Sequence, residues 1–147
     1  MEYTEAEIGR IFILRLEDGD RLPEAIENFA VNKDIESATV LFIGGADKGS
    51  QVIAGPDDGE AAEPLPMVGS LPGVSEAVGV GTIFTNEEDE PKLHLHSAFG
   101  REAKTITGCT RAGVDIWHIG EVVIWELKNH SACRKIDAET GFELLEV

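Results

Sequence analysis

The sequence predicts an α/β fold of the α+β type, a mainly antiparallel β-sheet of about seven strands with one main helix packed on it. Two observations carry this prediction. Short segments rich in β-branched and aromatic residues follow one another across turn residues, and only one segment has apolar residues at helical spacing. Because short turns join antiparallel neighbours, most of the sheet should be antiparallel. The length of 147 residues suits a single domain over residues 1–147.

The first half of the chain supplies the helix and three strands. Residues 9–16 (GRIFILRL) predict the first strand. In residues 22–34 (LPEAIENFAVNKD), apolar side chains recur at helical spacing, which predicts a helix with one face on the sheet. Residues 37–55 (SATVLFIGGADKGSQVIAG) predict two strands with a tight bend at Gly44-Gly45, and residues 56–66 predict an exposed loop or hairpin tip.

The second half of the chain is predicted to consist almost entirely of β-strands. Residues 74–85 (VSEAVGVGTIFT) predict one strand, followed by an exposed turn at residues 86–91. LHLHSAF and AKTITGCT predict a hairpin that turns near Gly100-Arg101, and residues 114–127 (VDIWHIGEVVIWEL) predict a last strand.

Charge and composition limit the function classes. The chain has 28 acidic and 12 basic residues, a net charge of −16, and no run of three basic residues. Nucleic-acid binding is therefore not expected, because it depends largely on Lys and Arg at the phosphates. The start of the chain does not resemble a secretion signal, and no apolar run approaches the roughly 20 residues of a membrane span. We expect a cytoplasmic protein, with no membrane contact and with Cys109 and Cys133 reduced.

The stretch KLHLHSAFG places two histidines on one face of a strand. His94 and His96 are two residues apart, and side chains at this spacing point to the same side. Two imidazoles side by side suit a borderline metal ion, with Zn²⁺ the usual occupant. The pair alone is a weak signal, because such a pattern also occurs at surfaces without a metal and a zinc site needs further ligands.

Two residues compete for the third ligand position. Counting the hairpin from a turn at Gly100-Arg101 pairs His96 with Thr105 and His94 with Thr107, which places Cys109 on the histidine face. Cys109 could equally be a small buried apolar residue. His118, between Trp117 and Ile119, is the second candidate, or else a hydrogen-bonded core histidine. His130 lies in a polar turn and ranks last.

Three protein ligands would leave the fourth zinc position open to water or to a small-molecule ligand, as in catalytic sites. Glu121 is the carboxylate to consider as a base or as a partner of a ligand, although an isolated Glu at this place in a strand is more often exposed. A metal-dependent enzyme acting on a small molecule is therefore an alternative function.

The order of these parts resembles the PPC domain, the plants and prokaryotes conserved domain, in its stand-alone prokaryotic form. The segments that carry the resemblance are LRLEDGDRLPEAIENFA, LFIGGADKGSQVIAG, PKLHLHSAFG and RKIDAETGFELL. The resemblance implies a mainly antiparallel sheet with one main helix, a homotrimer, and a metal held by a His-x-His strand and a later histidine after paired glycines.

Carried onto this chain, the resemblance implies that His94 and His96 are metal ligands. The family's Gly-Gly-His corresponds to Thr107-Gly108-Cys109 here. Either Cys109 substitutes as the third ligand, or His118 reaches the site, or the site binds metal more weakly. The basic hook of DNA-binding plant members is missing, and the Gly-Arg-Phe-Glu-Ile-Leu signature does not occur near residues 73–77. A DNA-binding or regulatory function by family analogy is therefore a disfavoured alternative.

Overall fold

The computed structural model of the chain describes residues 1–60 and 65–147. Its elements, in chain order, are β1 (Glu7–Glu17), β2 (Arg21–Leu22), α1 (Glu24–Asn32), β3 (Ala38–Ala46), β4 (Gln51–Pro56), β5 (Pro66–Ser70), β6 (Ser75–Thr85), β7 (Pro91–Arg101), β8 (Lys104–Cys109), the 3-10 helix η1 (Thr110–Ala112), β9 (Val114–Lys128), β10 (Cys133–Ile136) and β11 (Glu143–Glu146). Within the described residues, α1 is the only α-helix, and it lies inside the segment predicted to be helical.

The described strands form a nine-stranded antiparallel sheet and a separate two-stranded one. The main sheet has the order β1-β9-β3-β6-β7-β8-β4-β5, and the short β2 pairs with β9. The prediction of an antiparallel sheet is confirmed, but the prediction of about seven strands is wrong. The additional strands of the main sheet are β2, which has two residues and therefore no periodicity, and β5, a short segment that begins at a proline.

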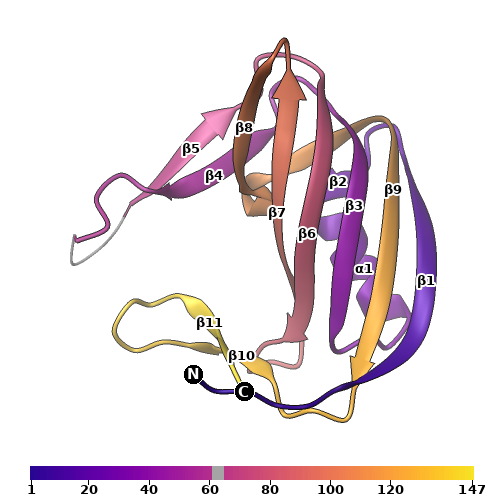
Figure 1. Cartoon of the computed structure of the whole chain (residues 1–147), viewed down its shortest axis with the longest axis vertical. Helices are drawn as coiled ribbons and strands as arrows, with labels where there is room; N and C mark the ends of the chain where they lie inside the picture. The colour runs from indigo at the N-terminus through magenta and orange to yellow at the C-terminus, as the bar shows by residue number, and fades with distance from the viewer. Residues whose placement is uncertain (61–64) are drawn as a thin grey trace.

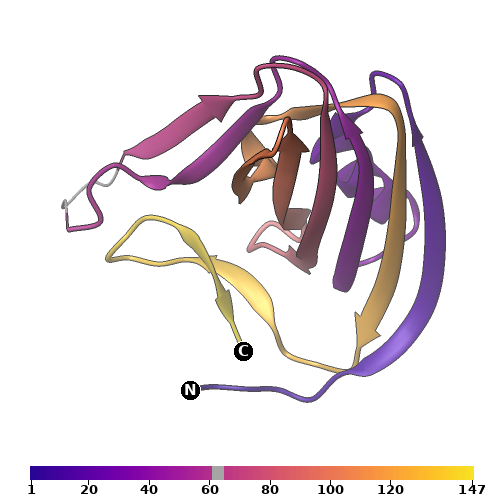
Figure 2. The same cartoon turned by 45° about the horizontal axis from the view of Figure 1, so that its top comes forward.

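The helix covers one face of the curved sheet (Figures 1 and 2). Ile26 and Ala30, one turn apart, are fully buried, and the ring of Phe29 meets that of Phe12 edge to face with centroids 5.4 Å apart. Across the sheet, the core residues alternate with residues of the opposite face, as the period of two in a strand requires. The largest of these core residues include Phe42, Ile83, Leu95, Phe99 and Ile124.

The glycines Gly44 and Gly45 do not form the predicted bend. They lie inside β3, and the chain turns later, at residues 47–50. A side chain at either position would meet β9, because a Cβ atom would lie 2.6 Å from the carbonyl oxygen of Ile119 at Gly44 and 2.5 Å from that of Trp117 at Gly45. These glycines therefore allow a close approach of two strands rather than a change of direction.

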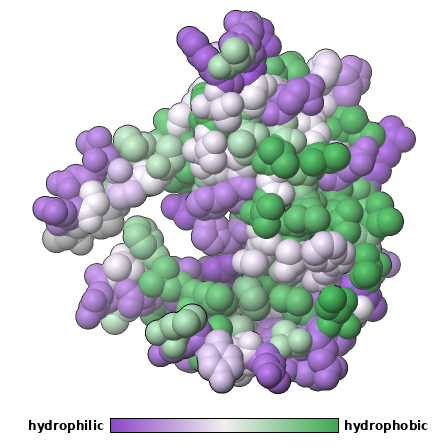
Figure 3. All heavy atoms as spheres, viewed as in Figure 1, coloured by the Kyte–Doolittle hydropathy of each residue, from purple (hydrophilic) through white to green (hydrophobic). Residues whose placement is uncertain are grey.

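The face of the sheet opposite α1, here called the outer face, is apolar and exposed. One row across neighbouring strands consists of Ile13, Val123, Leu41, Val80 and His96. Figure 3 shows apolar side chains covering much of the strands β1, β9, β3 and β6. A wide exposed apolar surface of this kind is typical of an interaction site.

Two hairpins stand beside this sheet. The arm, formed by β4 and β5, continues the main sheet beyond β8, and the C-terminal hairpin, formed by β10 and β11, lies across from it (Figures 1 and 2). The only α-helix of the described residues has nine residues, too few to cross a bilayer.

Candidate metal centre

The two histidines of β7 lie side by side on the outer face. Along β7 every second residue from Pro91 to Phe99 is buried, and His94 and His96 are the exposed residues between them. Their partners on β6 are Thr82 and Val80. The strands approach closely because Gly81 has no side chain: a Cβ atom there would lie 2.6 Å from the carbonyl oxygen of His94.

The hairpin of β7 and β8 brings Cys109 directly opposite His96. The predicted register, with His96 opposite Thr105, is wrong by four residues because the chain turns at Glu102-Ala103 rather than at Gly100-Arg101. Both turn residues have positive φ, 49° and 60°, as type I′ hairpin turns require. The displacement is even, so Cys109 still lies on the predicted face.

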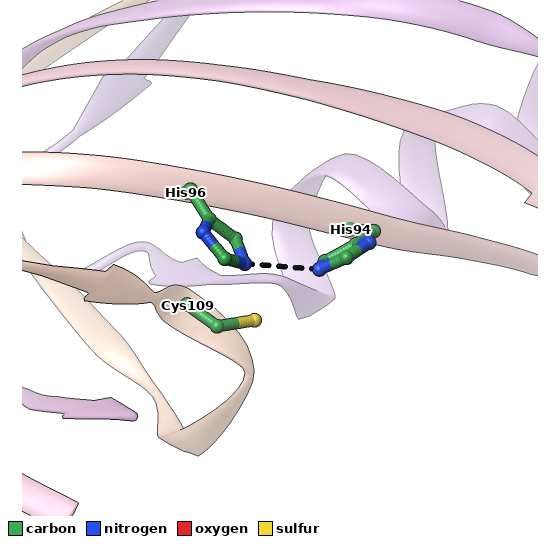
Figure 4. A group of neighbouring side chains, drawn as sticks. All are labelled: His94, His96 and Cys109. Carbon is green, nitrogen blue, oxygen red and sulfur yellow. Dashed lines mark hydrogen bonds between the residues drawn. The ribbon is translucent and has the colours of Figure 1, made fainter. Parts of the chain in front are cut away.

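Three potential metal ligands therefore meet at one point. The Nε2 atoms of His94 and His96 are 3.0 Å apart, and the ligand atoms of both histidines and Cys109 all lie within 4.8 Å of one another. Figure 4 shows the two imidazoles from β7 and the thiol from β8 pointing toward a common space. Cys109 is 3% exposed, so it closes the inner side of the group, while both histidines face outward.

Two contacts fix the position of Cys109. Gly108 lies against β4, where a Cβ atom would be 2.4 Å from the carbonyl oxygen of Ile53, so a glycine is needed directly before the cysteine. Directly after it, the buried Thr110 hydroxyl donates a hydrogen bond to the carbonyl oxygen of Leu95, the residue between the two histidines. The residues directly before and directly after Cys109 are therefore both fixed in position.

The electrostatic surroundings keep His94 in the form that binds metals. Partial burial lowers the pKa of His94 from its ordinary 6.5, and the positive charges of Arg134, His96 and Arg111 lower it further. A lower pKa leaves the imidazole neutral at pH 7, with a free nitrogen lone pair for a metal ion.

The distances between the three ligand atoms fit tetrahedral coordination of a metal ion. With metal–nitrogen and metal–sulfur bonds of ordinary zinc length, the ligand atoms of a tetrahedral site lie roughly 3.3 to 3.8 Å apart. The distances in this group, 3.0 Å between the imidazole nitrogens and at most 4.8 Å overall, require only small side-chain rotations to reach that geometry. The donor set of two imidazoles and one thiol is one that zinc prefers.

The comparison with known families agrees with the fold. The profile of the Plants and Prokaryotes Conserved (PCC) domain matches residues 3–128. The chain belongs to this family. No protein of curated function matches it.

Solved structures share the architecture of this PCC domain. A metal-containing protein of Archaeoglobus fulgidus is 26% identical, with a TM-score of 0.84 and full coverage of both chains. A plant- and prokaryote-conserved protein of Pyrococcus horikoshii is 24% identical, with a TM-score of 0.85 over 100% of this chain and 98% of that one. A protein of Bacteroides thetaiotaomicron, named only provisionally as DNA-binding, is 16% identical, with a TM-score of 0.78 over 96% of each chain.

The other predicted candidates lie elsewhere in the PCC domain. His118 and Glu121 belong to β9, which the strands β3 and β6 separate from β7. His118 forms a bulge with φ of 61°, and its backbone N–H donates to Asp18 Oδ1. His130 packs its ring against Phe84. The structure therefore brings Cys109, and neither His118 nor His130, to the histidine pair.

Two arginines near the centre were not among the candidates expected from the sequence. Arg111 follows Cys109 in η1, and Arg134 reaches the centre from β10, where its Nη2 donates to the hydroxyl of Thr82, the partner of His94 across the sheet. The position of Arg111, two residues after a candidate ligand, could have drawn attention to it. Arg134 has no such signal, because only the fold brings the C-terminal hairpin to this point.

Proposed function

We propose that the chain is a homotrimeric, metal-binding PCC-domain protein that holds Zn²⁺ through His94, His96 and Cys109. The observation that carries the proposal is the meeting of three ligand atoms of the right chemistry within 4.8 Å, contributed by two paired strands. The similarity to a metal-containing protein of Archaeoglobus fulgidus along the whole chain supports it.

Zinc suits this donor set better than other common ions. Imidazole and thiolate are borderline to soft ligands, whereas Mg²⁺ and Ca²⁺ require oxygen ligands. Three ligands from the chain leave one tetrahedral position for water or a small molecule, and a bound zinc ion supplies Lewis acidity there. The histidines lie on the exposed side, so within a single chain this position is open toward solvent.

Metal analysis of protein purified without an affinity tag tests the proposal. We expect close to one zinc ion per chain in the wild type, and a large loss in His94→Ala. The matched control is His118→Asn, which removes a histidine from β9 and tolerates the positive φ at that position. A wild type with little metal, or equal loss in both variants, would contradict the proposed centre. In that case the contact between His94 and His96 is simply a hydrogen bond.

The homotrimer is supported by the outer face. On this face, β1, β3 and β6 carry four apolar side chains that are between 53% and 84% exposed, namely Ile13, Ile43, Val78 and Val80. Such a surface is larger than a monomer usually leaves in water. Another copy of the same chain can cover this face without requiring basic residues, whereas nucleic acid cannot. The family resemblance described above implies three copies.

DNA binding is the weaker alternative. Its support is the provisional naming of structural neighbours, such as the Bacteroides protein, which is 16% identical. The net charge of −16 opposes it, because phosphate contacts need clustered basic residues. Seven of the 12 basic residues form ion pairs with carboxylates of the described residues, which further reduces the positive charge available.

A further inference from the structure

A cavity adjoins the candidate metal centre. It has a volume of 480 Å³ and lies between the arm, the C-terminal hairpin and the sheet. Figure 3 shows the hollow between these two hairpins. Pro56 and Pro66 line it from the arm, Phe142 and Leu144 from the hairpin, and His94 from β7. This volume is in the range of pockets that hold one small molecule.

The walls of the cavity are mostly apolar. Phe142 is 45% exposed and Leu144 is 48% exposed, and both line the cavity. Together with the prolines of the arm, they form an apolar lining next to a polar end at His94 and Arg111. A ligand that fits this arrangement has an apolar body and one polar end.

The polar end is positively charged, which is unusual in this chain. Among the described residues, Arg111 forms no ion pair, and neither does Arg134, although the chain has 28 carboxylates. Arg134 is only 6% exposed, and its guanidinium lies over the ring of Phe84, 5.9 Å from the ring centroid. With the described residues, that guanidinium forms one hydrogen bond, the contact of 3.3 Å with Thr82. Glu143 lines the cavity but forms no ion pair with Arg111 or Arg134. Two positive charges and one negative charge therefore lie at this end, and the net local charge is positive.

A buried guanidinium without a carboxylate partner is costly unless an anion compensates it. Arg134 stands beside the residue opposite His94, and Arg111 lines the cavity itself. An anionic group at the polar end of the cavity would contact Arg111 directly. Arg134 would lie nearby, beside Thr82. A carboxylate suits the site better than a phosphate because Glu143 opposes a higher negative charge, and because the apolar walls need an organic body to contact.

We propose that the cavity binds a small organic carboxylate, with its charged end at Arg111 and His94 and its apolar body against Phe142 and Leu144. The cavity and the arginines carry this inference, whereas the position of the carboxylate beside a metal ion rests on the proposed zinc centre. The ligand would then occupy the open side of that centre. Its two ends would match the exposed apolar side chains and the unpaired Arg111, which line the same cavity.

Isothermal titration of the full-length protein with hexanoate tests the inference. The comparison ligands are acetate, which lacks the apolar body, 1-hexanol, which lacks the charge, and inorganic phosphate. We expect hexanoate to bind at least about tenfold more tightly than each of them, since a charged hydrogen bond and the burial of several methylene groups each contribute that much or more. Equal affinity for acetate, 1-hexanol or phosphate would overturn the proposal.

Variants locate the binding site. Arg111→Gln and Phe142→Ala should each weaken hexanoate binding by roughly tenfold, because one removes a charged hydrogen bond and the other an aromatic wall. Lys104→Gln is the matched control, since it removes a positive charge at the far end of β8. Equal affinity in Arg111→Gln and Lys104→Gln would overturn the proposal.

Zinc content, measured on the same samples, separates this inference from the proposed function. We expect unchanged zinc in Arg111→Gln and Phe142→Ala. Should the wild type hold no zinc but bind hexanoate in an Arg111-dependent way, the carboxylate site stands and the zinc centre fails. Should zinc be present while hexanoate does not bind, the carboxylate site fails alone.

Discussion

Glu126 is the most strongly perturbed carboxylate of the described residues, and replacing it by Gln should destabilise the protein in a pH-dependent way. It lies on β9 with its side chain 3% exposed. Its Oε2 accepts hydrogen bonds of 2.8 Å from both the backbone N–H and Nε of Arg10, and its Oε1 accepts one of 2.6 Å from Nη2. These hydrogen bonds, with further help from Lys128, lower the pKa of Glu126 from 4.5 to about 2.

The size of the effect follows from this pKa. The unfolded chain binds the proton near pH 4.5 and the folded chain near pH 2, so the charged form stabilises the fold at neutral pH. A difference of about 2.5 pH units corresponds to roughly 3 to 4 kcal/mol, at about 1.4 kcal/mol per unit. The contribution is fully present above pH 4.5 and is lost as the pH falls toward 2. At pH 3 less than half of it should remain.

Urea unfolding of the wild type and Glu126→Gln at pH 7, 5, 4 and 3 measures this contribution. We expect the wild type to be more stable than Glu126→Gln by roughly 3 to 4 kcal/mol at pH 7, with the difference falling steadily below pH 4.5. Glu121→Gln is the control, since its carboxylate on the same strand is exposed. The reasoning would be refuted by a difference between wild type and Glu126→Gln that does not change with pH, or by an equal effect of Glu121→Gln.

Four further predictions follow from the site and the surface. In cobalt-substituted protein, Cys109→Ser should abolish the thiolate charge-transfer absorption; its persistence would exclude the cysteine as a ligand. Gly108→Ala should lower stability by about 1–3 kcal/mol in thermal or urea unfolding, because its Cβ has no space, whereas Gly59→Ala, whose Cβ would meet no atom of the described residues within 4 Å, should not. Light scattering should find three chains in the wild type and a smaller assembly in Val80→Glu, but not in Val31→Glu, an equally exposed position on α1. Fluorescence anisotropy at low salt should detect no binding to duplex DNA, and a salt-dependent complex would contradict this expectation.

The sequence was sufficient to predict the antiparallel sheet, the helix and the histidine pair, because each depends on periodicity within one segment. It was not sufficient for the register of the β7–β8 hairpin. Gly100 suggested a turn two residues too early in the chain, whereas the actual turn uses Glu102 and Ala103 at positive φ, and neither residue is typical there. Cys109 was nevertheless placed on the correct face, because the error was an even number of residues.

The sequence did not allow us to predict which residues far apart in the chain become neighbours in the fold. His118 was a reasonable third ligand as long as β9 could be placed beside the hairpin, but β9 pairs with β1 and β3. Arg134 comes next to Thr82 through the packing of the C-terminal hairpin, whose short strands carry no clear alternation. Both outcomes depend on which strands become neighbours, and this is determined by the packing of the whole chain rather than by local pattern.

The separate pairing of the C-terminal hairpin has a consequence for how such a protein can diverge. Among the described residues, β10 and β11 pair only with each other, whereas His94, His96 and Cys109 are positioned by the main sheet. Substitutions at Phe142 or Leu144 can therefore change what the cavity admits and leave the spacing of the three ligand atoms intact. The C-terminal hairpin can therefore vary in sequence without disturbing the main sheet, which positions the ligand atoms.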